Sequence, residues 1–173
     1  DLVAVSIASD IVPIIDENRI LAHFGLKQLN TNPRAGLKAI MNISGIGGRN
    51  HEIVVEDIVF RIGPRINAAG RIESAKKAIE LLVTQNLKKA EHIATKVNSC
   101  NESRKNIDRH ITQEALKMIS LEPGFREKKA TVLYNSKWHK GVVGIVASRM
   151  IEIYHRPTII LTASNGLATG SAR

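Results

Sequence analysis

The pattern of apolar and polar positions predicts a helical first part of the chain. Residues 2–15 are almost continuously apolar, which is typical of an element buried on all sides. Residues 18–29 follow a helical period, and Asn32 with Pro33 predicts the start of a second, short helix. The apolar face of the first helix is predicted to contain Ile20, Leu21, Phe24 and Leu29, and that of the second Leu37, Ile40 and Met41.

The next segment is less regular. Residues 44–50 are rich in glycine and predict a loop, because the helical pattern before them does not suit a dinucleotide-binding turn, which follows a strand. His51 to Phe60 favours a short, partly buried helix, and a strand is the alternative. From Ser74 a helical pattern resumes, with Ala75, Ala78, Ile79 and Leu82 at helical spacing.

A much longer helix follows, with Asn86 as its predicted cap. No proline or glycine interrupts it before Pro123. At a rise of 1.5 Å per residue it reaches about 50 Å, which indicates a connector between two domains or a coiled-coil arm. Its apolar seam contains Leu87, Ala90, Ile93, Ala94, Val97, Cys100, Ile107, Ile111, Ala115, Leu116 and Ile119.

The last part predicts a βαβ unit. Residues 130–134 and 157–161 read as strands, and a helix with a small-residue face begins near Gly141 between them. Strands joined in this way run parallel. Residues 167–171 are expected to form a third strand.

The stretch from Gly63 to Arg71 combines small residues with three polar side chains. The glycines and alanines predict a tight turn that another backbone or a ligand can approach closely. Arg65, Asn67 and Arg71 then form a candidate anion clamp, because arginine binds phosphate in a bidentate way. The alternative is a loop packed under a helix, with its arginines in ordinary salt bridges.

Polar residues interrupt two apolar patterns. Asp10 lies inside the first apolar run, where a carboxylate must be paired, protonated or metal-bound, and a turn-forming role is the alternative. Arg104 breaks the seam of the long helix, preceded by Asn98 and Asn101. These side chains either contact a ligand or lie exposed where the helix crosses between domains.

The net charge of the chain indicates which kind of partner it binds. The formal net charge is +9, and residues 61–140 carry 17 basic against 8 acidic residues. A basic middle part suits a polyanion such as nucleic acid. Aromatic residues make up only 3%, so base stacking is not expected to dominate. One cysteine suits a reducing compartment, and neither a membrane-spanning run nor a signal peptide is found.

Four stretches resemble one family. Gly63 to Arg71 reads GPRINAAGR and Trp138 to Arg149 reads WHKGVVGIVASR. They resemble the GPRxNAAGR and WHxGVxGIVASR motifs of the RecJ-type 5′→3′ single-stranded-DNA exonucleases in the DHH phosphoesterase superfamily. The final four residues are similar to GSGR, with Ala172 for the second glycine. Residues 1–13 resemble the fourth motif, DLVALGTIADVVP, except over residues 6–9.

The resemblance implies an α/β fold in three parts. Residues 1–72 would be the C-terminal part of a DHH domain, 73–122 the connector helices, and 123–173 the N-terminal part of a DHHA1 domain with the βαβ unit. The first three family motifs would lie upstream, so we expect an internal fragment of the catalytic core that is inactive by itself.

The resemblance also implies roles for single residues. Asp10 matches an aspartate that is catalytic and binds metal, in a centre of two Mn²⁺ or Mg²⁺ ions. Ser171 and Arg173 match the residues that bind the 5′-terminal phosphate, and Arg65 and Arg71 match arginines lining the same cleft.

Three further residues are expected to bind substrate. Asn101 and Arg104 would form one wall of the DNA path. His139 faces the substrate or else packs and caps the following helix.

The implied function is degradation of single-stranded DNA from its 5′ end in repair and recombination. Single-strand-binding protein and a helicase are the implied partners, and the bacterial cytoplasm is the implied location. The alternatives are a phosphoesterase for short oligonucleotides or cyclic dinucleotides, a non-catalytic nucleic-acid-binding module, and a purely structural βαβ protein.

Overall fold

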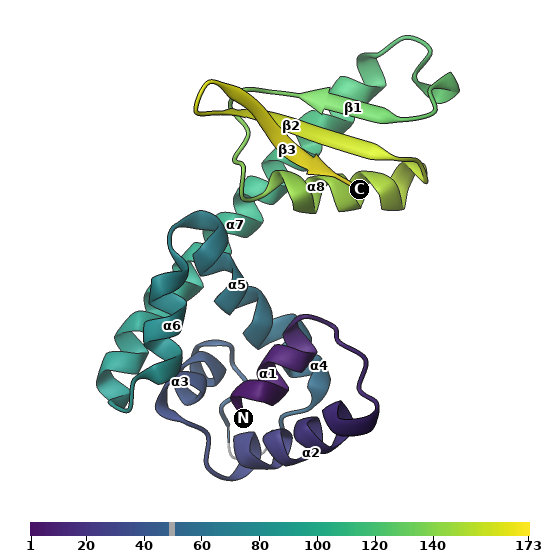
Figure 1. Ribbon diagram of the computed structural model, residues 1–173. Helices are drawn as coiled ribbons and strands as arrows, with labels where there is room; N and C mark the ends of the chain where they lie inside the picture. The colour runs from purple at the N-terminus through teal and green to yellow at the C-terminus, as the bar shows by residue number, and fades with distance from the viewer. Residues whose placement is uncertain (49–50) are drawn as a thin grey trace. The chain divides into compact units, whose positions relative to one another are not determined.

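The computed structural model describes residues 1–48 and 51–173, which form two compact units (Figure 1). Unit 1 is Asp1–Glu102 and unit 2 is Ser103–Arg173. The helix α7, Leu87–Leu121, begins in unit 1 and ends in unit 2. The predicted connector is therefore shared between the two units, and the family-based domain boundaries after residues 72 and 122 stay a prediction.

Unit 1 is built from helices that surround one apolar core. Leu37, Ile40 and Met41 lie in this core, which confirms their predicted burial. Its elements before α7 are α1 (Leu2–Ser9), α2 (Asp16–Thr31), α3 (Ala35–Ile43), the short α4 (Val55–Asp57), the π-helix η1 (Ile58–Ile62), α5 (Gly63–Ile72) and α6 (Ala75–Val83).

The apolar face predicted for residues 18–29 is wrong at three of its four positions. Ile20, Leu21 and Phe24 are exposed, and only Leu29 is buried. Helix α2 instead packs on α1 through small residues, since a Cβ placed on Gly25 would lie 2.3 Å from the Cβ of Ala4. This close backbone approach decides which side of α2 is buried, and the large side chains remain outside the contact.

The stretch from Gly63 to Arg71 is helical, so the predicted tight turn is wrong. It forms most of α5, which continues directly from η1. Pro64 lies in the first turn of α5, where a missing N–H is tolerated. The predicted close approach is confirmed at Gly63, because a Cβ there would lie 2.6 Å from Ser9 Oγ. The small residues thus serve the packing of α5 on α1.

Several predicted boundaries shift by a few residues. The cap of α3 is Arg34 rather than Asn32. Residues 51–54 are irregular, and the short helix expected over 51–60 appears as α4 and η1. The loop predicted for residues 44–50 is a turn and bend as far as it is described, and its last two positions, 49 and 50, lie outside the described residues.

The cap and most of the seam of α7 agree with the sequence pattern, whereas the seam of α6 agrees only in part. Asn86 Oδ1 accepts a hydrogen bond from Lys89 N–H at 3.0 Å, which confirms the predicted cap of α7. Ser74 Oγ accepts from Lys76 N–H at 3.3 Å and caps α6. In α6 the predicted apolar face is confirmed at Ala78 and wrong at Ala75 and Ile79, which are exposed, while Leu82 is half-buried. Leu81, which the pattern did not single out, is buried. Along α7 the buried seam residues are Ala90, Ile93, Ala94, Val97, Cys100, Ile111, Ala115 and Ile119.

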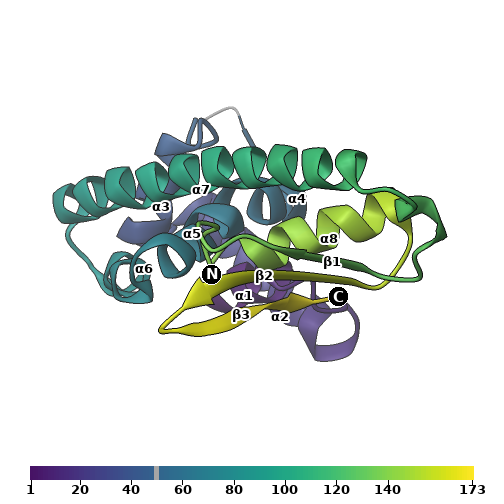
Figure 2. The same cartoon turned by 90° about the horizontal axis from the view of Figure 1, so that it is seen from above.

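Unit 2 contains the predicted βαβ unit. Its strands are β1 (Thr131–Tyr134), β2 (Thr158–Ser164) and β3 (Leu167–Ala172), in the order β1-β2-β3. Strands β1 and β2 are parallel and β2 and β3 antiparallel, which confirms the three expected strands. Helix α8 (Val143–Tyr154) starts two residues later than predicted and runs along one face of the sheet (Figure 2). A 3₁₀ turn, Phe125–Glu127, precedes β1.

In the described part of the chain, none of the helices is both long enough and apolar enough to cross a bilayer.

Candidate functional site

In unit 1, Asp10 and Asn67 line the same pocket. It has a volume of about 240 Å³, and α1 and α5 provide most of its wall. Ser6 and Ser9 add hydroxyl groups, and the remaining lining is apolar, from Leu2, Val5, Ile66 and Leu82. The contact of α5 with α1 at Gly63 therefore brings Asn67 into the neighbourhood of Asp10.

Asp10 is exposed at the end of α1. Its apolar neighbours predicted that it would lie in an element buried on all sides, and this prediction is wrong at Asp10. Asp10 is the C-cap residue of α1, and its backbone N–H donates to the carbonyl of Ser6 at 3.1 Å. An accessible carboxylate suits a hard cation such as Mg²⁺ or Mn²⁺. Among the residues that the structure describes, no three His, Cys, Asp or Glu side chains are grouped to hold a metal. That Asp10 supplies one ligand to a metal centre stays a prediction, with which its exposed carboxylate is compatible.

The two arginines of α5 lie in different surroundings. Arg71 is exposed in the last turn of α5. Arg65 is half-buried: its Nε donates to Asn98 Oδ1 on α7 at 2.9 Å, and its Nη1 donates to the carbonyl of Arg61 at 2.6 Å. Burial lowers the pKa of the Arg65 guanidinium, which remains a cation at neutral pH because arginine titrates so far above it. Arg65 thus ties α5 to α7.

Asn101 and Arg104 are the polar residues of α7 that were expected to bind substrate. Asn101, in unit 1, is completely buried. Arg104 is half-buried in unit 2 and lines a surface groove there. That both side chains form one wall of a DNA path stays a prediction.

In unit 2, Ser171 and Arg173 lie beside the start of α8. A Cβ placed on Gly144 would lie 3.3 Å from Ser171 Oγ and 3.7 Å from Arg173 Nη2. The end of the chain is held in place by reciprocal backbone hydrogen bonds of 2.9 and 3.0 Å between Arg173 and Thr158. The N-cap residue of α8, Val142, makes no side-chain cap hydrogen bond. A hydroxyl, a guanidinium and a helix N-terminus together form a favourable anion site.

His139 shapes the turn that leads into α8. Its Nδ1 accepts from Gly141 N–H at 3.1 Å, and its carbonyl accepts from Val142 and Val143 N–H at 2.9 and 3.3 Å. The preceding Trp138 is buried and donates from Nε1 to Glu114 Oε2 at 2.7 Å. These contacts give both residues a role in anchoring the turn, and a contact of His139 with substrate stays a prediction.

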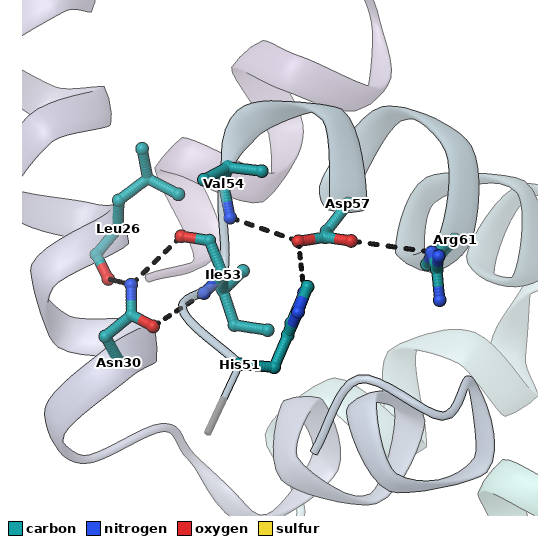
Figure 3. A network of polar contacts seen from close by, with 7 residues as sticks. All are labelled: Leu26, Asn30, His51, Ile53, Val54, Asp57 and Arg61. Atoms are coloured by element: carbon teal, nitrogen blue, oxygen red, sulfur yellow. Dashed lines mark hydrogen bonds and ion pairs between the residues drawn. The ribbon is translucent and has the colours of Figure 1, made fainter. Parts of the chain in front are cut away.

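A polar network near η1 was not anticipated (Figure 3). The buried carboxylate of Asp57 accepts from Val54 N–H at 3.2 Å, lies 2.8 Å from His51 Nε2 and lies 3.4 Å from Arg61 Nε. Burial raises the pKa of Asp57, but the contacts with His51, Val54 and Arg61 outweigh it and leave that pKa below its ordinary value. The spacing Val54-x-x-Asp57, a helix start followed by an acidic residue in the first turn, is the sequence signal that could have indicated it.

A second unanticipated network joins α7 to α8 in unit 2. The carboxylate of Asp108, 4% exposed, forms an ion pair of 2.9 Å with Arg149 Nη2 and lies 3.4 Å from Thr112 Oγ1. An acidic residue on the inward side of an apolar seam was the available signal, because a buried charge requires a partner.

Comparison with known proteins identifies relatives over the full length of the chain, although no protein-family model matches it. The RecJ exonuclease of Bacillus subtilis is 39% identical over 177 residues, covering 100% of this chain and 22% of the relative. The Escherichia coli protein of the same name is 34% identical and is covered to 30%. The chain thus spans less than a third of the length of these curated relatives.

Solved structures give the same result for the fold. RecJ from Thermus thermophilus, in complex with Mg²⁺, superposes with a TM-score of 0.80 at 31% identity, covering 92% of this chain and 24% of that one. An exonuclease RecJ bound to manganese gives a TM-score of 0.81 at 32% identity, with 94% and 40% covered. These matches confirm the mixed α/β fold. By sequence over its whole length and by fold, the chain belongs to the RecJ family, as a segment of a RecJ protein.

Proposed function

We propose that the intact protein is a metal-dependent 5′→3′ exonuclease for single-stranded DNA, and that this segment holds the 5′ end of the strand. The named relatives are single-stranded-DNA-specific exonucleases. The observation that carries the proposal is the arrangement of Ser171 and Arg173 beside Gly144 at the N-terminus of α8. The positive end of the helix dipole, a hydroxyl and a guanidinium suit a terminal phosphate, which bears more negative charge than a phosphate within the strand.

The other predicted residues have complementary parts in this proposal. Arg71 is exposed and can approach a phosphate directly. Asn67 faces the Asp10 pocket and can orient a group bound there. Arg65 acts first as a positioning residue, because Asn98 and the carbonyl of Arg61 hold its guanidinium.

The metal centre rests on Asp10 and on ligands outside this segment. The solved relatives contain Mg²⁺ or Mn²⁺, and the exposed Asp10 carboxylate is an oxygen ligand that both ions accept. Such a pair of ions, when bound, activates water and neutralises charge on the phosphodiester. Since one carboxylate cannot hold two ions, we expect the 173-residue chain to be inactive by itself.

The proposal is tested by the variant Arg173→Ala in the intact protein. Digestion of a 5′-phosphorylated oligonucleotide is compared with that of the same strand carrying a 5′-hydroxyl. Loss of one hydrogen bond to a charged group is worth about 1.5–3 kcal/mol, so the preference for the phosphorylated end should fall about 10- to 100-fold. The affinity for Mn²⁺ should not change.

Arg126→Ala is the matched control, because Arg126 is an exposed arginine of unit 2 outside the Ser171–Arg173 site. It should keep the preference of the unmodified protein. An unchanged preference in Arg173→Ala would reject the assignment of the end-binding site.

Partners and location in the cell follow from the proposed reaction. A strand degraded from its end must first be separated from its complement and kept single, so we include a helicase and a single-strand-binding protein as partners. We place the activity in the bacterial cytoplasm, where the DNA lies.

A further inference from the structure

A strongly basic groove lies along α7 and α8 in unit 2. It has a volume of about 350 Å³ and is lined by polar and charged residues. Four of them are basic, Arg104, Lys105, Arg109 and Arg149, against a single carboxylate, that of Asp108.

The carboxylate of Asp108 does not balance this charge at the surface. It is buried and paired with Arg149, whose side chain is still 51% exposed. Only one of the guanidinium nitrogens of Arg149, Nη2, donates to Asp108 in this contact. Asp108 therefore positions Arg149, and the groove presents an excess of positive charge to solvent.

The spacing of the cations along α7 adds a second argument. Lys105 and Arg109 are both exposed and lie four residues apart, on the same face of the helix. Like charges at this spacing destabilise a helix by a few tenths of a kcal/mol. Arg109 Nη1 donates to the neutral side chain of Asn106 at 3.5 Å. Two exposed cations on one face of the helix, in a groove shared with Arg104 and Arg149, suit an anionic partner.

We propose that this groove binds internal backbone phosphates of the single strand whose 5′ end lies at Ser171 and Arg173. The inference rests on the proposed function and extends it to nucleotides further along the strand. The two contacts are separate, because Gly144 and Arg149 are five residues apart on α8, which rotates them by about 140° around the helix axis. With no aromatic residue in its lining, the groove binds through charge and without base preference.

The experiment uses the intact protein with both groove cations neutralised, Lys105→Gln with Arg109→Gln. Arg149 is left in place, because its removal would leave Asp108 buried and unpaired. Binding of fluorescent, 5′-phosphorylated oligothymidylates of three and twenty nucleotides is measured by anisotropy in EDTA, over 50 to 200 mM salt.

Each lost phosphate contact lowers the slope of log K against log salt by about 0.7 for a single strand, hence by about 1.4 for the double variant. Over this fourfold range of salt, the unmodified protein should lose about sevenfold more affinity for the 20-mer than the variant does. Binding of the 3-mer should change less than twofold, and the preference for a 5′-phosphate should stay the same.

The matched control is Lys117→Gln with Lys129→Gln, which removes two exposed lysines of unit 2 outside the groove. It should keep the original salt slope. An unchanged slope in the groove variant or an equal loss for the 3-mer would overturn the proposal. If Arg173→Ala keeps its end preference while the groove variant loses slope, the end assignment fails and the groove survives. If the unmodified protein binds neither oligonucleotide, the proposed function fails.

Discussion

The stability of unit 1 should depend on the buried carboxylate of Asp57. This side chain holds the start of α4 and η1 through Val54 N–H, and it contacts His51 and Arg61 (Figure 3). The substitution Asp57→Ala removes all three contacts at once. Because α5 continues directly from η1, a loosened η1 should also loosen the helix that carries Asn67.

The contacts contribute unequally. Loss of a hydrogen bond at a helix N-terminus costs about 1 kcal/mol. Loss of the short contact between His51 and the Asp57 carboxylate costs about 1.5–3 kcal/mol, the range for a hydrogen bond to a charged group. The contact with Arg61 is long, at 3.4 Å, and this arginine is half exposed, so it adds less than about 1 kcal/mol. We therefore expect Asp57→Ala to lower the free energy of unfolding by about 3 kcal/mol and Arg61→Ala by less than about 1 kcal/mol.

Urea unfolding of the 173-residue chain followed by far-UV circular dichroism measures this difference. With a slope of about 2 kcal/mol per molar urea, the midpoint of Asp57→Ala should fall by about 1.5 M. The pKa of Asp57 is lowered in the folded state, so its contribution is fully present above the unfolded value of 3.8 and is lost as pH falls through the folded pKa. The difference between the unmodified chain and Asp57→Asn should accordingly shrink as the pH is lowered below about 4.

Two results would refute this reasoning. One is an Asp57→Ala midpoint within about 0.3 M of the unmodified chain at pH 7, which corresponds to only about 0.6 kcal/mol at this slope. The other is an equal loss of stability in Arg61→Ala, which would show that the exposed arginine and not the buried carboxylate is decisive.

Two further predictions concern glycine packing and the buried tryptophan. Gly63→Ala should destabilise the chain by about 1–3 kcal/mol, since its Cβ would lie 2.6 Å from Ser9 Oγ, whereas Gly70→Ala in the same helix should stabilise it by about 0.5–1 kcal/mol because its contacts begin at 3.5 Å. Urea midpoints of the pair decide this, and equal signs would contradict it. Trp138→Phe should cost at least about 1 kcal/mol by leaving Glu114 without its 2.7 Å partner, and Glu114→Gln, which still accepts from Nε1–H, should cost less. A larger loss in Glu114→Gln would count against that account.

Much of the local structure was predictable because it depends on near neighbours. The cap Asn86, the long α7 and the individual strands β1 and β2 each follow from residues only a few positions apart. The family resemblance was equally local, since it rests on short motifs. Backbone hydrogen bonding and helical periodicity act over this range, so a linear pattern contains them.

The backbone form of Gly63 to Arg71 could not be predicted in this way. Its glycines and alanines suit a turn and a closely packed helix equally well, and contact with Ser9 on α1 decides between them. The same applies to α2, where the approach of Gly25 to Ala4 leaves Leu21 and Phe24 exposed. Both outcomes depend on residues distant in sequence.

In the candidate site, too, some features follow from the sequence and others only from the tertiary structure. By itself the sequence determined which residue types are present: the Asp10 carboxylate, the Arg65 and Arg71 guanidinium groups, and the terminal Ser171 and Arg173. Only the tertiary structure decided that Asn98 holds Arg65, that Asn101 is buried, and that Gly144 adjoins Ser171. The physical reason is that the chemistry of a side chain belongs to its residue type, whereas its partners, exposure and field come from packing between distant segments.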